Sequence, residues 1–263
     1  MLFRKTKLLK KIINWMAGVI YRYGLLIGIF LLWQAGSEMK WFNPSVLPAL
    51  DTIAYALWNG ISDGILLGDM AISLQRSGIA FLGAVIIAIP LGILMGQINA
   101  IDRVLDPVVQ LFRQTSALAL YPVFILLLGL GETSKVFVIF WATIFPLLVN
   151  TISGVKEIDP KIIEMSRVYG ATSFTVFRRV IIPAALPSIF IGMRLAATTA
   201  LLLLIASEMI GANSGIGFRV MHAQYNFQIP LMFASIVLMA LLGLIANYVL
   251  VDLQKRFCRW SDK

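Results

Sequence analysis

Residues 156–183 read KEIDPKIIEMSRVYGATSFTVFRRVIIP and form a polar segment between two long apolar stretches. Asp159 is a residue type that caps helix N-termini, and Pro160 suits the first helical position, so a helix should begin there. Gly170 is well placed to end this helix, because glycine readily adopts a left-handed turn. The segment therefore predicts a short helix that ends at a fixed turn.

A second short helix is expected directly after this turn. It should open near Thr172 or Ser173 and run to Ile182, with Pro183 beginning the next long helix. A simple connection between two helices needs only a few residues. Two compact helices therefore call for another explanation, and we expect a cytoplasmic partner to hold them.

The apolar stretches on either side of this segment are long enough to cross a bilayer, since hydrocarbon about 30 Å thick needs roughly 20 mainly apolar residues. Six such runs occur, at residues 16–36, 70–98, 107–129, 134–155, 184–208 and 230–252. The predicted fold is an all-α integral membrane protein with six transmembrane helices. Small residues at helical spacing, Gly24 with Gly28 and Gly92 with Gly96, predict close approach of helix backbones.

The remaining segments divide the chain. Residues 1–18 form a basic amphipathic segment, read either as a helix in the headgroup region or as a frayed tail. Residues 19–66 hold the first span and an outer connector, which is too polar to cross and in which a short helix from Leu50 to Trp58 is expected. The main transmembrane domain covers 67–256, and 257–263 form a basic tail.

The composition requires the bilayer as solvent. With 59% hydrophobic and only 13% charged residues, the chain has too little polar surface to cover a water-soluble globule. A net charge of +9 does not indicate nucleic-acid binding, because the basic residues lie beside apolar runs and not in a stripe with exposed aromatic residues. The bilayer is therefore an expected partner, and nucleic acid is not.

The basic residues also predict orientation, because Lys and Arg that flank spans remain in the cytoplasm. Both ends of the chain are basic, so both termini are predicted inside and the number of spans is even. The loops predicted inside hold Arg103, Arg113, Lys156, Lys161, Arg167, Arg178, Arg179 and Arg194. The side predicted outside holds only Lys40, Arg76, Lys135 and Arg219.

The polar segment resembles the cytoplasmic loop of permease subunits of ATP-binding cassette (ABC) importers. That loop carries the EAA motif, which is E-A-A, three residues, G, nine residues, then I-x-L-P. Glu164, Gly170 and Pro183 stand at its spacing, with Met165 and Ser166 in place of its two alanines. The resemblance extends over about residues 67–256 and implies a cytoplasmic coupling helix within the loop 156–183.

Further stretches resemble the subfamily that imports nitrate, sulfonates, taurine and related solutes. They are FILLLGLGETSKVF, PLLVNTISGVKEIDP, IIPAALPSIFIGMRLA and SEMIGANSGIGF. One departure is Ser116-Ala117, where that subfamily usually has two prolines, so the third span is expected to be straighter or more polar there. The implied solute is a nitrate-, sulfonate- or taurine-like anion, the alternative being another small organic solute such as a pyrimidine precursor of thiamine or an aromatic acid.

The resemblance also implies partners and a location. No G-x-x-x-x-G-K-[ST] phosphate loop occurs in the sequence, so ATP and Mg²⁺ are expected in separate ATPase subunits, with no cofactor in this chain. The expected partners are two ATPase subunits, a second permease copy and an extracytoplasmic solute-binding protein, in a bacterial inner membrane. The residues expected to couple to the ATPase are Glu164, Ser166, Arg167, Tyr169, Gly170 and Pro183.

Residues of the translocation path are predicted from polar groups at membrane depth. Glu208 ends the fifth span, where it is expected either near the outer gate or simply in contact with water. Threonines could face a polar cluster across the bundle or bond back to their own helix. The candidates are Arg113, Gln114, Ser116, Thr198, Thr199, Glu208 and Asn213.

Three rival functions have less support. An ion channel or proton-coupled carrier would want ionisable groups buried in several spans, and few are expected here. An enzyme would need a convergent catalytic constellation, and a metal site or catalytic triad is not expected with one cysteine, Cys258, and one histidine, His222. A scaffold without a transport role would have no ATPase partner.

Overall fold

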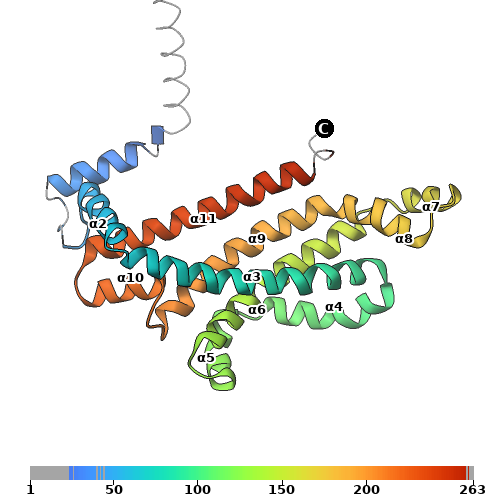
Figure 1. The fold of residues 1–263 in the computed structure, drawn as a ribbon, viewed down its shortest axis with the longest axis horizontal. Coiled ribbons are helices and arrows are strands. Elements are labelled where there is room, and N and C mark those ends of the chain that lie inside the picture. The colour runs from blue at the N-terminus through green and yellow to red at the C-terminus, as the bar shows by residue number, and fades with distance from the viewer. Residues whose placement is uncertain are drawn as a thin grey trace, which may run out of the picture.

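The computed structural model describes residues 24, 25, 27–39, 41, 43, 45–258 and 260, and the regular structure within them is helical (Figure 1). Residues 27–38 are helical and precede the labelled helices. The bounds are α2 Leu50–Ser62, α3 Ile65–Gln97, α4 Asn99–Gln114, α5 Ala117–Leu128, α6 Glu132–Lys156, α7 Pro160–Val168, α8 Ser173–Val176, the π-helix η1 Phe177–Ile181, α9 Ile182–Met209, α10 Ile216–Tyr225 and α11 Ile229–Phe257.

Four helices among the described residues are long and apolar enough to cross a membrane. They are Ile65–Gln97, Glu132–Lys156, Ser173–Met209 and Ile229–Phe257, and they coincide with four predicted spans. Of the predicted first span, 16–36, the structure describes residues 24, 25 and 27–36, which are helical. In its described part, Trp33 contacts Phe233 of α11 edge to face at 5.7 Å and donates a hydrogen bond to the carbonyl oxygen of Pro48.

Helix α6 lies at the centre of the fold and makes its most extensive contacts with α3 and α9. A Cβ added to Gly92 would lie 2.7 Å from the Cβ of Thr151, and one added to Gly96 would lie 2.6 Å from the Cβ of Val155. The close approach predicted at these two glycines is confirmed, and it joins α3 to α6. Gly28 has no such neighbour among the described residues.

The predicted third span, 107–129, is not one helix. It is divided into α4 and α5, which meet at an angle of 98°. Thr115 and Ser116 are extended, and the Ser116 hydroxyl accepts a hydrogen bond from the Ala119 N–H at 3.4 Å. Serine at this position starts a new helix instead of continuing the old one, so the expectation of a straighter span at Ser116-Ala117 was wrong.

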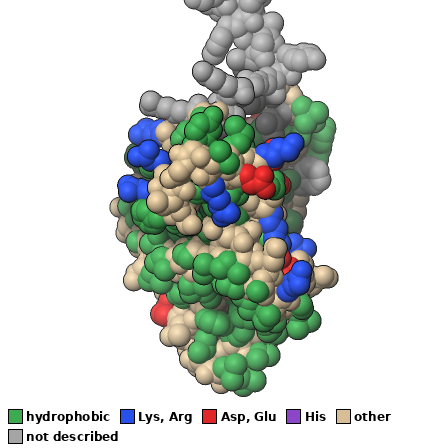
Figure 2. Space-filling view, turned by 90° about the vertical axis from the view of Figure 1, so that its right-hand side faces the viewer, with side chains coloured by type: hydrophobic (Ala, Val, Ile, Leu, Met, Phe, Trp, Pro, Cys, Tyr) green, Lys and Arg blue, Asp and Glu red, His purple; other side chains and the backbone are tan. Residues whose placement is uncertain are grey.

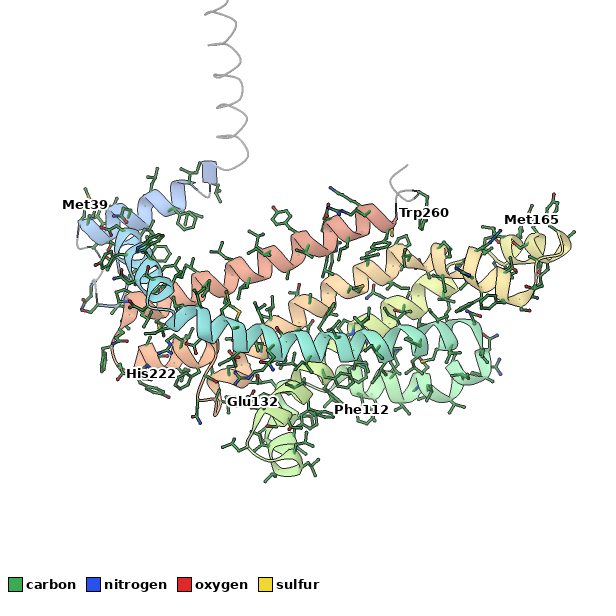
Figure 3. All side chains as sticks on the ribbon, viewed as in Figure 1. Met39, Phe112, Glu132, Met165, His222 and Trp260 are labelled. Carbon is green, nitrogen blue, oxygen red and sulfur yellow. The ribbon has the colours of Figure 1, made fainter. Side chains whose placement is uncertain are left out.

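The connectors lie at opposite ends of the bundle. The outer connector contains α2, which confirms the short helix predicted there and extends it to Ser62. Both α2 and α10 lie at one end of the long axis, and α7 and α8 lie at the other (Figure 1). Figure 3 shows the same separation, with His222 near the first end and Met165 at the second. The two ends of the molecule therefore carry different helices.

Candidate functional site

The elbow, defined as residues Pro160–Val176, projects from the end of the bundle. The Asp159 carboxylate accepts a hydrogen bond from the Lys161 N–H at 2.9 Å and caps α7. At the other end the Ala171 N–H donates to the carbonyl of Ser166, while Gly170, at φ +81°, donates to that of Arg167. These two bonds form a Schellman motif, so both predicted helix boundaries are confirmed.

The second helix of the elbow runs into the next span without a break. Its start at Ser173 is confirmed, with the Thr172 hydroxyl accepting from the Thr175 N–H at 3.3 Å. It continues through η1 into α9, so that Ser173–Met209 is one span. Pro183 lies in the first turn of α9, where its missing N–H is tolerated, and the wider π-turn before it keeps the helix continuous. The predicted change of helix at Ile182 and Pro183 therefore agrees with the start of α9 to within one residue, but no break separates the elbow from the span.

The elbow presents apolar side chains to its surroundings. No residue of α7 is buried, and Val168 and Tyr169 are 86% and 85% exposed. Figure 2 views this end, where Lys and Arg side chains lie around hydrophobic ones. At the base of the elbow, Ile158, Val176 and Ile181 are buried in the core shared with α3, α6 and α9. The elbow is thus anchored on one side and open on the other.

Most of the predicted coupling residues are accessible. Glu164, Arg167, Tyr169 and Gly170 are exposed. Ser166 is half-buried, and its hydroxyl donates to the Ile162 carbonyl at 2.7 Å. Arg167 also lines a cavity of about 370 Å³ between the elbow and the adjacent ends of α3 and α6.

A buried ionic cluster lies toward the opposite end, where α6 begins and α9 ends. Arg76 of α3 pairs with Glu208 of α9, with 2.7 Å between Nη1 and Oε1, and Arg76 Nη2 donates to Glu132 Oε1 at 2.7 Å. Lys135 also pairs with Glu132. Glu208 is 1% exposed and Arg76 3%, so the expectation that Glu208 meets water was wrong.

The cluster also holds the loop before α10. Glu208 accepts from the Gly217 N–H, and the hydroxyl of Ser73 accepts from the Ile216 N–H, each at 2.9 Å. Asp69 accepts from the Gly215 N–H and pairs with Arg219. Oxygen atoms of α3 and α9 therefore satisfy the first N–H groups of α10.

This burial corrects one expectation. Few buried ionisable groups were expected, yet Asp69, Arg76, Lys135 and Glu208 are all buried in long helices. They pair with acidic or basic groups of the cluster and do not form a separate polar path. The described residues contain no group of three His, Cys, Asp or Glu side chains suited to a metal ion.

The other predicted path residues separate into two cavities. Arg113 and Thr199 line one of about 230 Å³, between the end of α4, α6 and α9. Thr198 lines a different and larger one, between α9, α10 and α11. Both threonine hydroxyls donate to carbonyls of their own helix. Gln114, Ser116 and Asn213 are exposed, and their roles in a path stay predictions.

Comparison with known proteins now decides the family. The sequence profile of the family described as binding-protein-dependent transport system inner membrane component matches residues 88–259. The chain belongs to this family. It is a translocation subunit of an ABC importer, and the permease shares 36% identity over 237 residues with the putative aliphatic sulfonates transport permease protein SsuC of Escherichia coli (strain K12), which covers 90% of each chain.

Two further similarities agree with this assignment. The taurine transport system permease protein TauC of Escherichia coli (strain K12) is 31% identical over 245 residues, which cover 91% of the permease and 89% of TauC. A chain of the MetNI methionine ABC transporter, in inward facing conformations, matches the fold with a TM-score of 0.60 at 21% identity. That match covers 73% of the permease and 96% of the MetNI chain.

Sequence reasoning missed the partners of Glu208 and misplaced one arginine. Arg194 was assigned to a loop, but it lies inside α9. A signal was present for it, because Arg194 falls within the apolar run 184–208 that was itself predicted to span. No comparable signal exists for the pairing of Arg76 with Glu208, which are far apart in the sequence of the permease.

Proposed function

We propose that this permease imports a small sulfonate-like anion and that separate ATPase subunits drive it through the elbow. The observation that carries this proposal is the open apolar surface of the elbow at Val168 and Tyr169. Exposed apolar residues rimmed by charge mark a protein-binding surface. ATP and Mg²⁺ would be bound by the partners, and the permease itself would carry no cofactor.

The orientation of the elbow follows from its charges. Lys156, Lys161, Arg167, Arg178 and Arg179 are exposed at this end. At the opposite end Arg76 and Lys135 are buried, and Arg219 is paired with Asp69. Lys and Arg residues that flank spans are retained in the cytoplasm. This asymmetry supports a cytoplasmic elbow and cytoplasmic termini, with the solute-binding protein acting at the other end.

The elbow would transmit force because it is rigidly joined to the bundle. Asp159 and Gly170 fix its turns, and α8 continues without a break into α9. A partner that moves the elbow would therefore also move α9. Coupling requires that the two end states differ in their contacts with the partner. A second permease copy would complete the translocation path between the two chains.

The solute class is supported by the sulfonate and taurine relatives. The test is uptake into liposomes that contain the permease, its ATPase subunits and its solute-binding protein. We expect ATP-dependent accumulation of butanesulfonate or taurine and none without the ATPase. Selective uptake of a neutral pyrimidine or an aromatic acid would overturn the solute class. Retention of ATP-dependent uptake by a permease that lacks the elbow would overturn the coupling role.

A further inference from the structure

A large groove lies between α9, α10 and α11. It has a volume of about 560 Å³ and mostly apolar walls, which include Leu201, Ile205, Ile216 and Met239. Its polar side chains are Arg194, Thr198 and Asn247. A volume of this size suits a small organic ligand.

The three polar groups lie at one end of the groove. A Cβ added to Gly243 of α11 would lie 3.2 Å from Cδ1 of Leu201, so these helices meet at that level. Helices α9 and α11 run antiparallel, and equal numbers of residues along each cover the same height. Asn247, four residues after Gly243, therefore lies near Thr198, three residues before Leu201. Arg194 lies one further turn along α9. The groove is therefore apolar along most of its length and polar at one station.

Arg194 is a charge without a counter-ion in the described part of the chain. The described ion pairs involve Arg76, Lys135, Lys156, Arg219 and Arg256, and none involves Arg194. It lies within the span Ser173–Met209, about 22 Å along the axis from Met209 at a rise of about 1.5 Å per residue. A charged group at membrane depth usually faces water or a partner.

The donors at this station suit an oxyanion. The Arg194 guanidinium can hold two oxygens of a carboxylate or sulfonate at once. The Asn247 amide makes no hydrogen bond among the described residues and can add a further donor. Thr198 contributes less, because its hydroxyl already donates to the Arg194 carbonyl at 3.1 Å.

We propose that Arg194 and Asn247 form an anion-binding station in the translocation path, with the apolar groove receiving the alkyl part of the solute. The ligand class is a small organic oxyanion with an apolar tail, such as an alkanesulfonate. Charge complementarity selects this occupant over an uncharged lipid chain. The inference deepens the proposed function and rests on it for the direction of transport.

A labelling experiment tests the station without transport. Thr198→Cys is made in a Cys258→Ser background, and the full importer in lipid vesicles is treated with two thiol reagents of similar size. One is the anionic sulfonatoethyl methanethiosulfonate and the other its cationic trimethylammonium counterpart. Relative to their rates with a free thiol, the anionic reagent should react about tenfold faster. Arg194→Gln should abolish this preference, and Arg194→Lys should retain most of it.

Two results would overturn the station. Equal reaction with both reagents would mean that the Arg194 charge has turned away to the membrane interface. No reaction with either would mean that lipid or a second copy fills the groove. Butanesulfonate should also slow the labelling in the Arg194 protein and not in the Gln variant, whereas lipid in the groove would leave the labelling rate unaffected by butanesulfonate.

Transport then separates this inference from the proposed function. Uptake of butanesulfonate by Arg194→Gln should fall about tenfold. If the wild type imports only a neutral solute but the anionic labelling preference persists, the proposed solute class fails and the station stands. If butanesulfonate uptake is normal in Arg194→Gln, the station fails and the proposed function stands.

Discussion

Arg76 and Glu208 form a buried ion pair between α3 and the end of α9, with 2.7 Å between Nη1 and Oε1. Both side chains are almost completely closed to solvent. Glu208 therefore cannot contact a solute unless this pair opens. In this structure Glu208 holds the loop before α10 and does not lie on an open surface. Its predicted position near a gate stays a prediction.

Removing one member of this pair should destabilise the permease strongly. Glu208→Met removes the buried partner of Arg76 and the acceptor of the Gly217 N–H, and losing one member of a buried pair costs about 3 kcal/mol or more. The unfolding midpoint of the purified protein in detergent should fall clearly. The double variant Arg76→Met with Glu208→Met should lose less stability than the sum of the losses in the two single variants, Arg76→Met and Glu208→Met. Simple additivity would show that the two side chains do not interact.

The pairing of Asp69 with Arg219 should control the mobility of the loop before α10. Asp69→Asn removes the charge that holds Arg219 and weakens the bond to the Gly215 N–H. Hydrogen exchange at Gly215 should become about tenfold faster, because local opening costs less. Asp63→Asn is the matched control, since Asp63 is exposed. Equal exchange in both variants would contradict the assigned role.

The contact between α3 and α6 predicts a difference between two glycines of one helix. Gly92→Ala places a methyl group 2.7 Å from the Cβ of Thr151 and should cost about 1–3 kcal/mol through overpacking. Gly78→Ala meets no atom within 4 Å and should be neutral or stabilising by up to about 1 kcal/mol. Thermal unfolding in detergent compares them. Similar midpoints would show that the two helices are not in close contact.

The turn at Gly170 predicts a loss of coupling without a loss of folding. At φ +81° a β-branched residue is strained, whereas asparagine is tolerated. Gly170→Val should reach the membrane in normal amount but lose most ATP-dependent uptake, because α7 is held at a different angle. Gly170→Asn should retain uptake. Wild-type uptake by the valine variant would show that the angle of α7 is unimportant.

The parts of the fold that depend on neighbouring residues could be predicted from the sequence. Asp159, Pro160 and Gly170 act within one or two turns, so the limits of α7 followed from their side chains. The apolar runs gave four long helices for the same reason. The bend at Ser116 was missed because Arg113, Gln114 and Ser116 were interpreted as polar residues of one span, although a serine can also start a new helix.

Long-range pairing could not be predicted in this way. Arg76 and Glu208 meet only after α3, α6 and α9 have packed, and no local pattern matches one charge to another. The same limit applied to the path residues, since Thr198 and Thr199 are adjacent in sequence but line different cavities. Arg194 was assigned to a loop because of its charge, although its position within the apolar run 184–208 indicated a span.

The most direct test concerns which compartment the elbow faces and what covers it there. Tyr169→Cys in a Cys258→Ser background is treated with a membrane-impermeant maleimide in intact cells and in inside-out vesicles. We expect labelling only in inside-out vesicles, and protection from labelling when the ATPase subunits are bound. Labelling from outside intact cells would place the elbow outside the cytoplasm and rule out its coupling to ATPase subunits there.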